Sequence, residues 1–146
     1  MTKRTLFSSL DEKAGLLRAI PGLADSNPDV LVRLMPLVDQ VSFAPEATLV
    51  REGSYGSQVF VVVDGHADVI AGGERLATVE RGDYVGEVAV LDHGVRTASV
   101  VATTPVRALA MDPRSFATLL REPLVATKLA AQLARRVRTM DTVTTG

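Results

Sequence analysis

Two charged residues of opposite sign stand nine positions apart in the largely apolar stretch GEVAVLDHGVRTAS, residues 86–99. The acid is Glu87, the base is Arg96, and a polar turn at 92–94 separates them. A guanidinium can hold a phosphate through a planar, bidentate fork, and a carboxylate can accept hydrogen bonds from a sugar hydroxyl. The pair could therefore hold opposite ends of one small ligand that carries a phosphate and a ribose.

The neighbours of this pair fit the same chemistry. Gly86 would let the backbone approach a ligand closely, and Thr97 offers a hydroxyl to a phosphate or a base. A short helix over 86–91 would aim its first N–H groups, at the positive end of the helix dipole, toward an anion. The alternative is an exposed Glu–Arg pair that contributes about 0–1 kcal/mol, with Gly86 as a turn residue and Thr97 as a strand former.

The elements that must position these residues follow the order helices, strands, helices. Helical patterns cover 10–19 and then continue from the cap signal Asn27–Pro28 to Val38. Between Val41 and Met111, short apolar runs are separated by glycine, proline or aspartate, which indicates a sandwich or barrel. The expected strands are 41–43, 48–51, 58–63, 67–70, 76–79, 97–102 and 106–111.

Two helices are expected after the strands. Asp112–Pro113 opens a short one that stops near Pro123, and a longer one runs from Leu124 to about Met140. The tail 142–146 is expected to fray. One stripe of the long helix is apolar and could pack on the domain's own strands or form a dimer seam: Leu129, Leu133, Val137 and Met140. Its arginines 135, 136 and 138 are interpreted as a solvated helix end, favoured by the helix dipole.

Composition narrows the class of protein. The 146 residues predict one domain, 1–146, and a formal net charge of −1 disfavours a general nucleic-acid binder. The absence of cysteine excludes disulfides and thiolate metal sites. The start has no secretory signal pattern, and the longest β-branched run, around 59–63, is too short to span a membrane. We therefore expect a cytoplasmic protein with no membrane partner.

The stretch that holds the charged pair resembles the phosphate-binding cassette of cyclic nucleotide-binding domains. That pattern is Gly-Glu-aliphatic-small, a short spacer, and Arg-Ala/Ser/Thr-Ala, matched here by 86–89 and 96–98. A second motif, VREGSYGSQVFVVVDGHADV at 50–69, is similar to the family's glycine-punctuated strand pair, and RGDYVGE at 81–87 resembles its run into the cassette. The resemblance covers roughly residues 10–140.

The resemblance implies a mainly β fold with flanking helices. It is an eight-stranded, jelly-roll-like β-roll over 41–111, with N-terminal helices within 1–40 and C-terminal lid or dimer helices within 112–140. It also implies a sensor or regulatory domain that binds a cyclic nucleotide and performs no catalysis. Cyclic AMP is favoured, and the hydroxyl of Thr97 keeps cyclic GMP open.

The resemblance also implies roles for individual residues. Arg96 would pair with the cyclic phosphate, and Glu87 would hold the ribose 2′-hydroxyl. Gly86 and Thr97 belong to the same cassette, and backbone N–H groups of Val88, Ala89 and Ala98 would complete the phosphate cradle. Three strand residues would line the ribose and base pocket by this resemblance, although plain core packing is the favoured interpretation for them: Val69, Leu76 and Val79.

The last helix indicates which partners the chain would have. In the family it repositions over the base, so this chain would switch through it and report to an effector protein or a fused output domain. KLAAQLARRVR at 128–138 resembles the dimer helix of bacterial catabolite activator proteins, so a homodimer through 124–140 is possible. The resemblance to those activators does not extend to DNA binding.

Two other classes of protein compete with the sensor. A degenerate domain could keep the fold and act as a ligand-independent interaction or dimerisation module. A β-barrel metalloenzyme of the cupin type would need several histidines and carboxylates around a metal. The chain has only His66 and His93, both in expected turns. We therefore expect no metal site, no cofactor and no catalytic residue.

Overall fold

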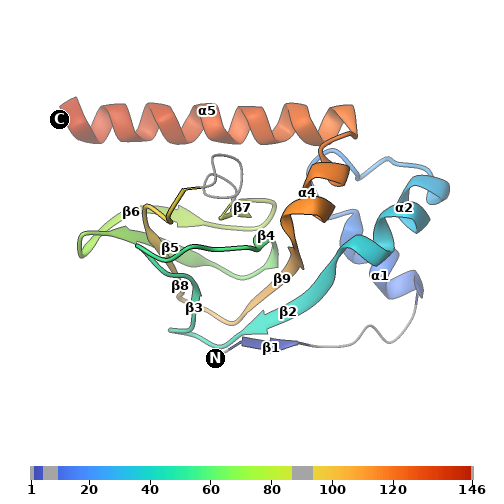
Figure 1. The fold of residues 1–146 in the computed structure, drawn as a ribbon, viewed down its shortest axis with the longest axis horizontal. Helices are drawn as coiled ribbons and strands as arrows, with labels where there is room; N and C mark the ends of the chain where they lie inside the picture. Colours follow the sequence, from blue (N-terminus) through green and yellow to red (C-terminus); the bar gives the residue numbers. More distant parts are fainter. Residues whose placement is uncertain (1, 5–9, 87–93, 146) are drawn as a thin grey trace.

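The computed structural model describes residues 2–4, 10–86 and 94–145 and has the expected order of helices, strands and helices (Figure 1). The helical elements are α1 (Leu10–Leu17), α2 (Pro28–Leu34), the 3-10 turn η1 (Met35–Leu37), α4 (Pro113–Leu119) and α5 (Pro123–Thr145). The strands are β1 (Thr2–Arg4), β2 (Asp39–Phe43), β3 (Thr48–Val50), β4 (Val59–Asp64), β5 (Ala67–Ala71), β6 (Glu74–Val79), β7 (Tyr84–Val85), β8 (Ser99–Ala102) and β9 (Val106–Met111).

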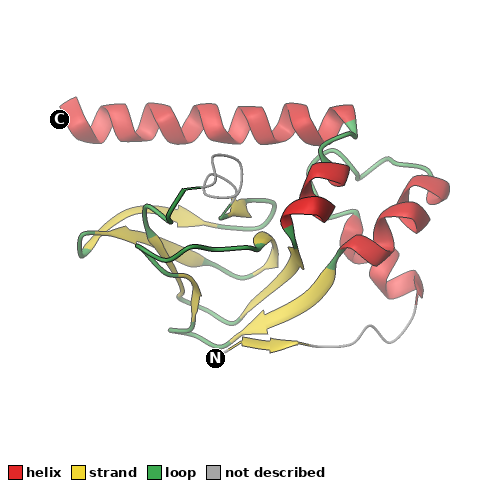
Figure 2. Cartoon of the chain, in the orientation of Figure 1, coloured by secondary structure: helices red, strands yellow, loops and turns green. Residues whose placement is uncertain are grey.

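The strands form two antiparallel sheets. One has the order β1-β2-β9-β4-β7 and the other the order β3-β8-β5-β6. Strands β2 to β9 are the eight strands of the β-roll, and β1 extends the edge of the first sheet by pairing with β2. Helices α1, α2 and α4 gather at one end of the roll, while α5 lies along one side of it (Figure 2). The fold class implied by the sequence is confirmed.

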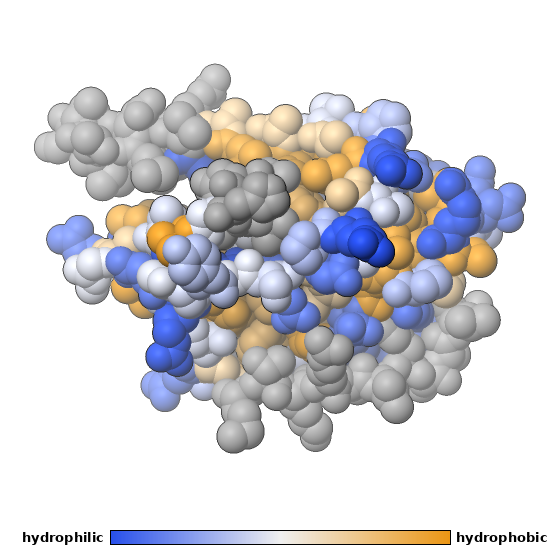
Figure 3. Space-filling model, viewed as in Figure 1, coloured by the Kyte–Doolittle hydropathy of each residue, from blue (hydrophilic) through white to orange (hydrophobic). Residues whose placement is uncertain are grey.

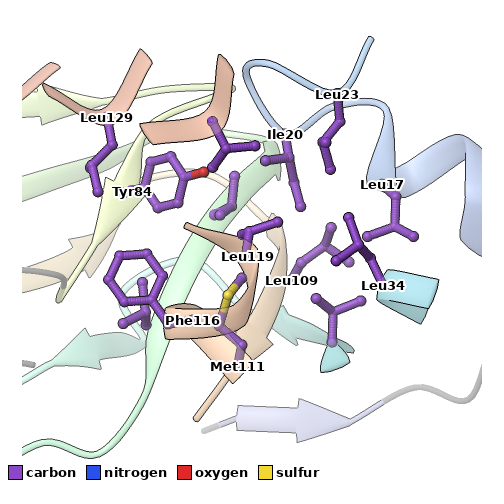
Figure 4. Packing of buried hydrophobic residues seen from close by; sticks show 14 of the residues in the cluster. Leu17, Ile20, Leu23, Leu34, Tyr84, Leu109, Met111, Phe116, Leu119 and Leu129 are labelled. Carbon is purple, nitrogen blue, oxygen red and sulfur yellow. The ribbon is translucent and has the colours of Figure 1, made fainter. Parts of the chain in front are cut away.

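Strands β4 and β9 contribute to both cores. Successive side chains of a strand point to opposite faces, and both faces of these two strands are buried. In β4, Val59 and Val61 face the helices, whereas Phe60 and Val62 face the inside of the roll. The molecule thus has two cores. The helix-side core comprises Leu17, Ile20, Leu23, Leu31, Leu34, Met35, Val38, Val59, Val61, Tyr84, Leu109, Met111, Phe116, Leu119, Val125 and Leu129 (Figure 4). The roll interior comprises Val41, Phe43, Ala47, Leu49, Val50, Phe60, Val62, Ala67, Val79, Val85, Val100, Ala102, Val106, Ala108 and Ala110.

Helix starts are fixed by the caps that the sequence predicts. The Asn27 side chain accepts hydrogen bonds from the backbone N–H groups of Asp29 and Val30, at 3.1 and 3.3 Å. The Asp112 carboxylate accepts one from the backbone N–H of Ser115 at 2.7 Å. Each cap satisfies donors that the first turn of a helix leaves without a partner, so α2 and α4 begin where proline follows the cap.

Helix α5 packs on its own domain through the first part of the apolar stripe. Val125 and Leu129 are buried in the helix-side core, and Leu133 packs against that core. Gly22 allows the start of α5 to approach closely, because a Cβ at Gly22 would lie 2.6 Å from the backbone of Leu124. For Leu129 and Leu133 the structure therefore gives the packing alternative rather than a dimer seam. The side chains of Val137 and Met140 lie outside the described residues.

Several boundaries differ from the sequence-based expectation. Strands β1 and β7 were not predicted, since three and two residues are too short for a period of two to be recognised. Helix α5 continues to Thr145, so the expectation of a frayed tail from 142 is wrong. The predicted short helix over 86–91 falls outside the described residues except for Gly86.

The visible surface mixes hydrophilic and apolar residues, and apolar residues gather along the described part of α5 (Figure 3). Within the described residues, none of the helices combines the length and hydropathy that crossing a bilayer requires.

Candidate functional site

Arg96 lies in the loop that leads into β8, and only 6% of its surface is exposed to solvent. Its Nη2 donates a hydrogen bond to the carbonyl oxygen of Gln58 at 2.9 Å. Two backbone hydrogen bonds fix the loop beneath it: the Arg96 N–H donates to Ser54 O, and the Gly53 N–H donates to Arg96 O, both at 2.8 Å. The glycine-punctuated segment 50–69 therefore folds directly against Arg96.

Two glycines make room for the Arg96 guanidinium. A Cβ at Gly56 would overlap its Nη2, Nε and Cζ atoms, and a Cβ at Gly86 would overlap Nη1. Gly86 also has a φ of +87°, in the left-handed region where side chains are strained. Gly56 has no such backbone requirement, so space for Arg96 is the reason for glycine there. The sequence had marked Gly56 only as part of a motif.

A pocket of about 360 Å³ lies against Arg96. Its lining combines apolar residues of the roll interior with polar residues of the 51–58 loop. The lining residues are Thr48, Leu49, Val50, Arg51, Ser54, Gly56, Ser57, Gln58, Phe60 and Arg96. Leu49, Val50 and Phe60 supply the apolar part of this lining, and polar or charged side chains supply most of the rest. Here an apolar ring could meet Leu49 and Phe60 while an anion meets the guanidinium.

The loop that carries Gly53 and Gly56 is anchored at two further points. The Glu52 N–H donates to Ser99 Oγ at 2.8 Å, which ties the loop to the start of β8. The Glu52 carboxylate accepts a hydrogen bond from the Gly72 N–H at 3.2 Å, which ties it to the β5–β6 turn. These links hold the loop against the segment that supplies Arg96.

The structure brings together some of the residues predicted for the site. Thr97 is exposed and Ala98 half-buried, next to Arg96 and before β8. Val79 is buried in the roll interior, Val69 packs against that core, and Leu76 is half-buried. These three strand residues are not among those that line the pocket beside Arg96. Core packing accounts for Val79 and Val69, and their contact with a ligand stays a prediction.

Glu87, Val88 and Ala89 lie outside the described residues, as does His93. Within the described ranges, no group of three or more histidine, aspartate or glutamate residues is placed to hold a metal ion. His66 is exposed in the β4–β5 turn, where its backbone N–H donates to Thr104 Oγ1 at 2.9 Å.

Sequence reasoning missed a contact between α5 and β7. Gln132 is 5% exposed, and its amide bonds both the N–H and the carbonyl of Tyr84. Arg136 Nη2 also donates to Tyr84 O, so the interpretation of Arg136 as part of a solvated helix end is wrong. A signal was present in the sequence: Gln132 is a polar residue beside the apolar stripe positions 129 and 133, on the helix face that packs on the domain.

Comparison with known proteins agrees with this geometry. A family model described as "Cyclic nucleotide-binding domain" matches residues 40–122. A cAMP-dependent protein kinase regulatory subunit from Colletotrichum orbiculare is 31% identical over 106 residues, which is 71% of this chain and 27% of that protein.

Two solved structures have a similar fold. The cAMP-bound PfPKA-R (141-441) aligns with a TM-score of 0.79 and 22% identity, over 92% of this chain and 47% of that chain. The catabolite activator protein of Thermus thermophilus aligns with a TM-score of 0.68 and 30% identity, over 84% of this chain and 60% of that one. The chain spans about a quarter of the length of the regulatory subunit that it matches.

Proposed function

The chain belongs to the cyclic nucleotide-binding domain family, and from this premise we propose that it is a sensor for cyclic AMP, with cyclic GMP as the other candidate ligand. The observation that carries the proposal is Arg96, a residue only 6% exposed, whose guanidinium is held beside two glycines at the wall of a pocket with a mixed polar and apolar lining. A charge in such a position interacts with a phosphate more strongly than one surrounded by water, because the local dielectric is low.

In this proposal Arg96 binds the cyclic phosphate and Glu87 binds the ribose 2′-hydroxyl. Backbone N–H groups of Val88, Ala89 and Ala98 complete the cradle. A ligand whose phosphate carries one charge suits a site built around one buried guanidinium. The same site would hold a 5′-monophosphate less well, because that group carries more charge and lacks the ring that fixes its position on the ribose.

Helix α5 would act as the lid whose position reports occupancy. The relative named above is a regulatory subunit, so we propose regulation and no catalysis for this chain as well. The output would be an effector protein or a further domain. Dimerisation through 124–140 and a location in the cytoplasm stay predictions.

Calorimetric titration of the protein with cyclic AMP and cyclic GMP, with 5′-AMP as a third ligand, tests the proposal. We expect micromolar binding of a cyclic nucleotide and much weaker binding of 5′-AMP, and the same titrations rank the two cyclic ligands. Absence of heat and of a thermal shift with both cyclic ligands would reject the sensor and favour the interaction module.

Replacing Arg96 tests the residue itself. Hydrogen bonds between charged groups contribute about 1.5–3 kcal/mol each, so Arg96→Ala should weaken cyclic-nucleotide binding by at least an order of magnitude. Arg96→Lys keeps the charge but loses the planar fork, so its affinity should lie between those of the parent and Arg96→Ala. Arg121→Ala removes the same charge from an exposed position and is the matched control. An Arg96→Ala protein that is folded and binds as tightly as the parent contradicts the assignment.

A further inference from the structure

Gln132 of α5 forms two hydrogen bonds with the backbone of Tyr84 in β7, a contact called the clasp below. The clasp bears on how the residues beside Arg96 are positioned. The Tyr84 N–H donates to Gln132 Oε1 at 2.9 Å, and Gln132 Nε2 donates to Tyr84 O at 3.3 Å. This is the exchange of two hydrogen bonds that a paired residue of a neighbouring antiparallel strand would make. In the described part of the first sheet β7 is the last strand, so the amide takes the place of the next one.

Tyr84 is held from its side chain as well. Its ring lies 6.0 Å from that of Phe116 in α4, centroid to centroid, and it shares the helix-side core with Leu129 of α5 (Figure 4). Arg136, one helical turn after Gln132, donates from Nη2 to Tyr84 O at 2.5 Å. The position of β7 is thereby fixed by α5 through side chains spaced four residues apart on one face.

The same short strand leads into the site. Val85 pairs with Phe60, which lines the pocket, and Gly86 lies against the Arg96 guanidinium closely enough that a Cβ would overlap Nη1. A shift of β7 therefore moves Gly86 relative to Arg96. Gln132 is not among the pocket-lining residues, so its influence on the site passes through the backbone between 84 and 86.

We propose that Gln132 is a positioning residue for nucleotide binding: by bonding Tyr84 it sets Gly86 against Arg96, and this contact is what links the docking of α5, the lid proposed above, to occupancy of the site. The part that concerns the nucleotide rests on the proposed function. Because linkage between two equilibria is reciprocal, a clasp that strengthens nucleotide binding is itself strengthened by the nucleotide.

The chemistry of the amide makes this contact close to all-or-none. Gln132 is buried, and a buried amide that loses its partners keeps the cost of desolvation without the gain of the hydrogen bonds. Partial displacement of α5 is therefore unfavourable, whereas full undocking returns both groups to water. Two separate arrangements of a helix are what a ligand needs in order to shift a population.

The first arm of the test needs no ligand. In ¹⁵N-labelled protein, Gln132→Ala should speed hydrogen exchange of the Tyr84 amide and shift the Gly86 and Arg96 amide resonances. Lys128→Ala, an exposed position on the same helix, is the matched control and should leave all three unchanged. If Tyr84 loses protection while Gly86 and Arg96 stay unchanged, the clasp is local and the proposal is wrong.

The second arm is titration with cyclic AMP and cyclic GMP. Gln132→Ala should weaken binding about tenfold, within the usual range for coupled sites. Arg136→Ala should weaken it less, because Gln132 still bonds both the N–H and the carbonyl oxygen of Tyr84. In the parent protein the nucleotide should slow exchange of the Tyr84 amide. Unchanged or tighter binding by a folded Gln132→Ala protein overturns the proposal. A parent that binds neither nucleotide rejects the proposed function instead, and the first arm still decides whether Gln132 positions Gly86.

Discussion

The two cores of the molecule are built from different side chains, although β4 and β9 contribute to both. The helix-side core is dominated by leucine, with methionines, Tyr84 and Phe116 filling the space between sheet and helices. The roll interior is dominated by valine and alanine, with Phe43 and Phe60 in edge-to-face contact, ring centroids 5.6 Å apart. Long side chains fill one core, and short ones line the other.

This difference separates stability from binding. Close packing of large side chains makes the helix-side core the greater source of hydrophobic stabilisation. The roll interior has shorter side chains, and the pocket beside Arg96 lies at its margin, next to Leu49, Val50 and Phe60. The same strands thus carry a face of long side chains packed on the helices and a face of shorter side chains beside the proposed nucleotide pocket.

The largest expected effect comes from emptying the filled core. Phe116 is 1% exposed and contacts Tyr84, so Phe116→Ala should lower the free energy of unfolding by about 3–5 kcal/mol. Chemical unfolding monitored by circular dichroism measures the loss. Val32→Ala, at a side chain that is 61% exposed, is the control and should change stability by less than about 0.5 kcal/mol. A loss below about 1 kcal/mol for Phe116→Ala would contradict the division between the two cores.

The next effect belongs to the binding side. Gly56→Ala places a methyl group where the Arg96 guanidinium lies, so it should weaken cyclic-nucleotide binding about tenfold by displacing that group. Titration calorimetry measures the change. Gly15→Ala is the matched control, because a Cβ at Gly15 meets no atom within 4 Å.

A double-mutant cycle decides whether Gly56 acts through Arg96. In an Arg96→Ala background the guanidinium is absent, so adding Gly56→Ala should have little further effect on binding. Equal losses in both backgrounds would mean that the new methyl group disturbs the loop or the pocket directly. The comparison requires measurable residual binding by Arg96→Ala, which high protein concentration provides.

Much of the fold could be predicted from the sequence because its signals are local or periodic. The caps at Asn27 and Asp112 and the alternating strands act within a few residues of themselves. Arg96 was recognisable because its motif is short and contiguous. The role of Gly56 was not, because it depends on two segments forty positions apart meeting at one guanidinium.

The contact of α5 with β7 escaped prediction for a related reason. A two-residue strand has no period, and Gln132 and Tyr84 are separated by 48 positions, so nothing local pairs them. Gln132 looked like one polar residue of an amphipathic helix. Only its burial and hydrogen bonds in the folded chain show that its amide bonds the edge of a strand.

The smallest expected effect concerns acid. The backbone N–H of Ser115, followed by its side chain, holds the pKa of Asp112 below the ordinary value of 3.8. A carboxyl whose pKa is lower in the folded state adds stability above its unfolded pKa, near 4, and loses that stability as the pH falls through the lower value. Asp112 caps α4, the helix that carries Phe116, so acid should weaken the start of this helix. Asp112→Asn keeps the cap without titrating, and its free energy of unfolding should fall less between pH 5 and pH 3 than that of the parent. Denaturant titrations at both pH values measure this fall in the free energy of unfolding for each protein. An equal fall in the parent and in Asp112→Asn would show that the Asp112 carboxyl does not contribute to the acid response.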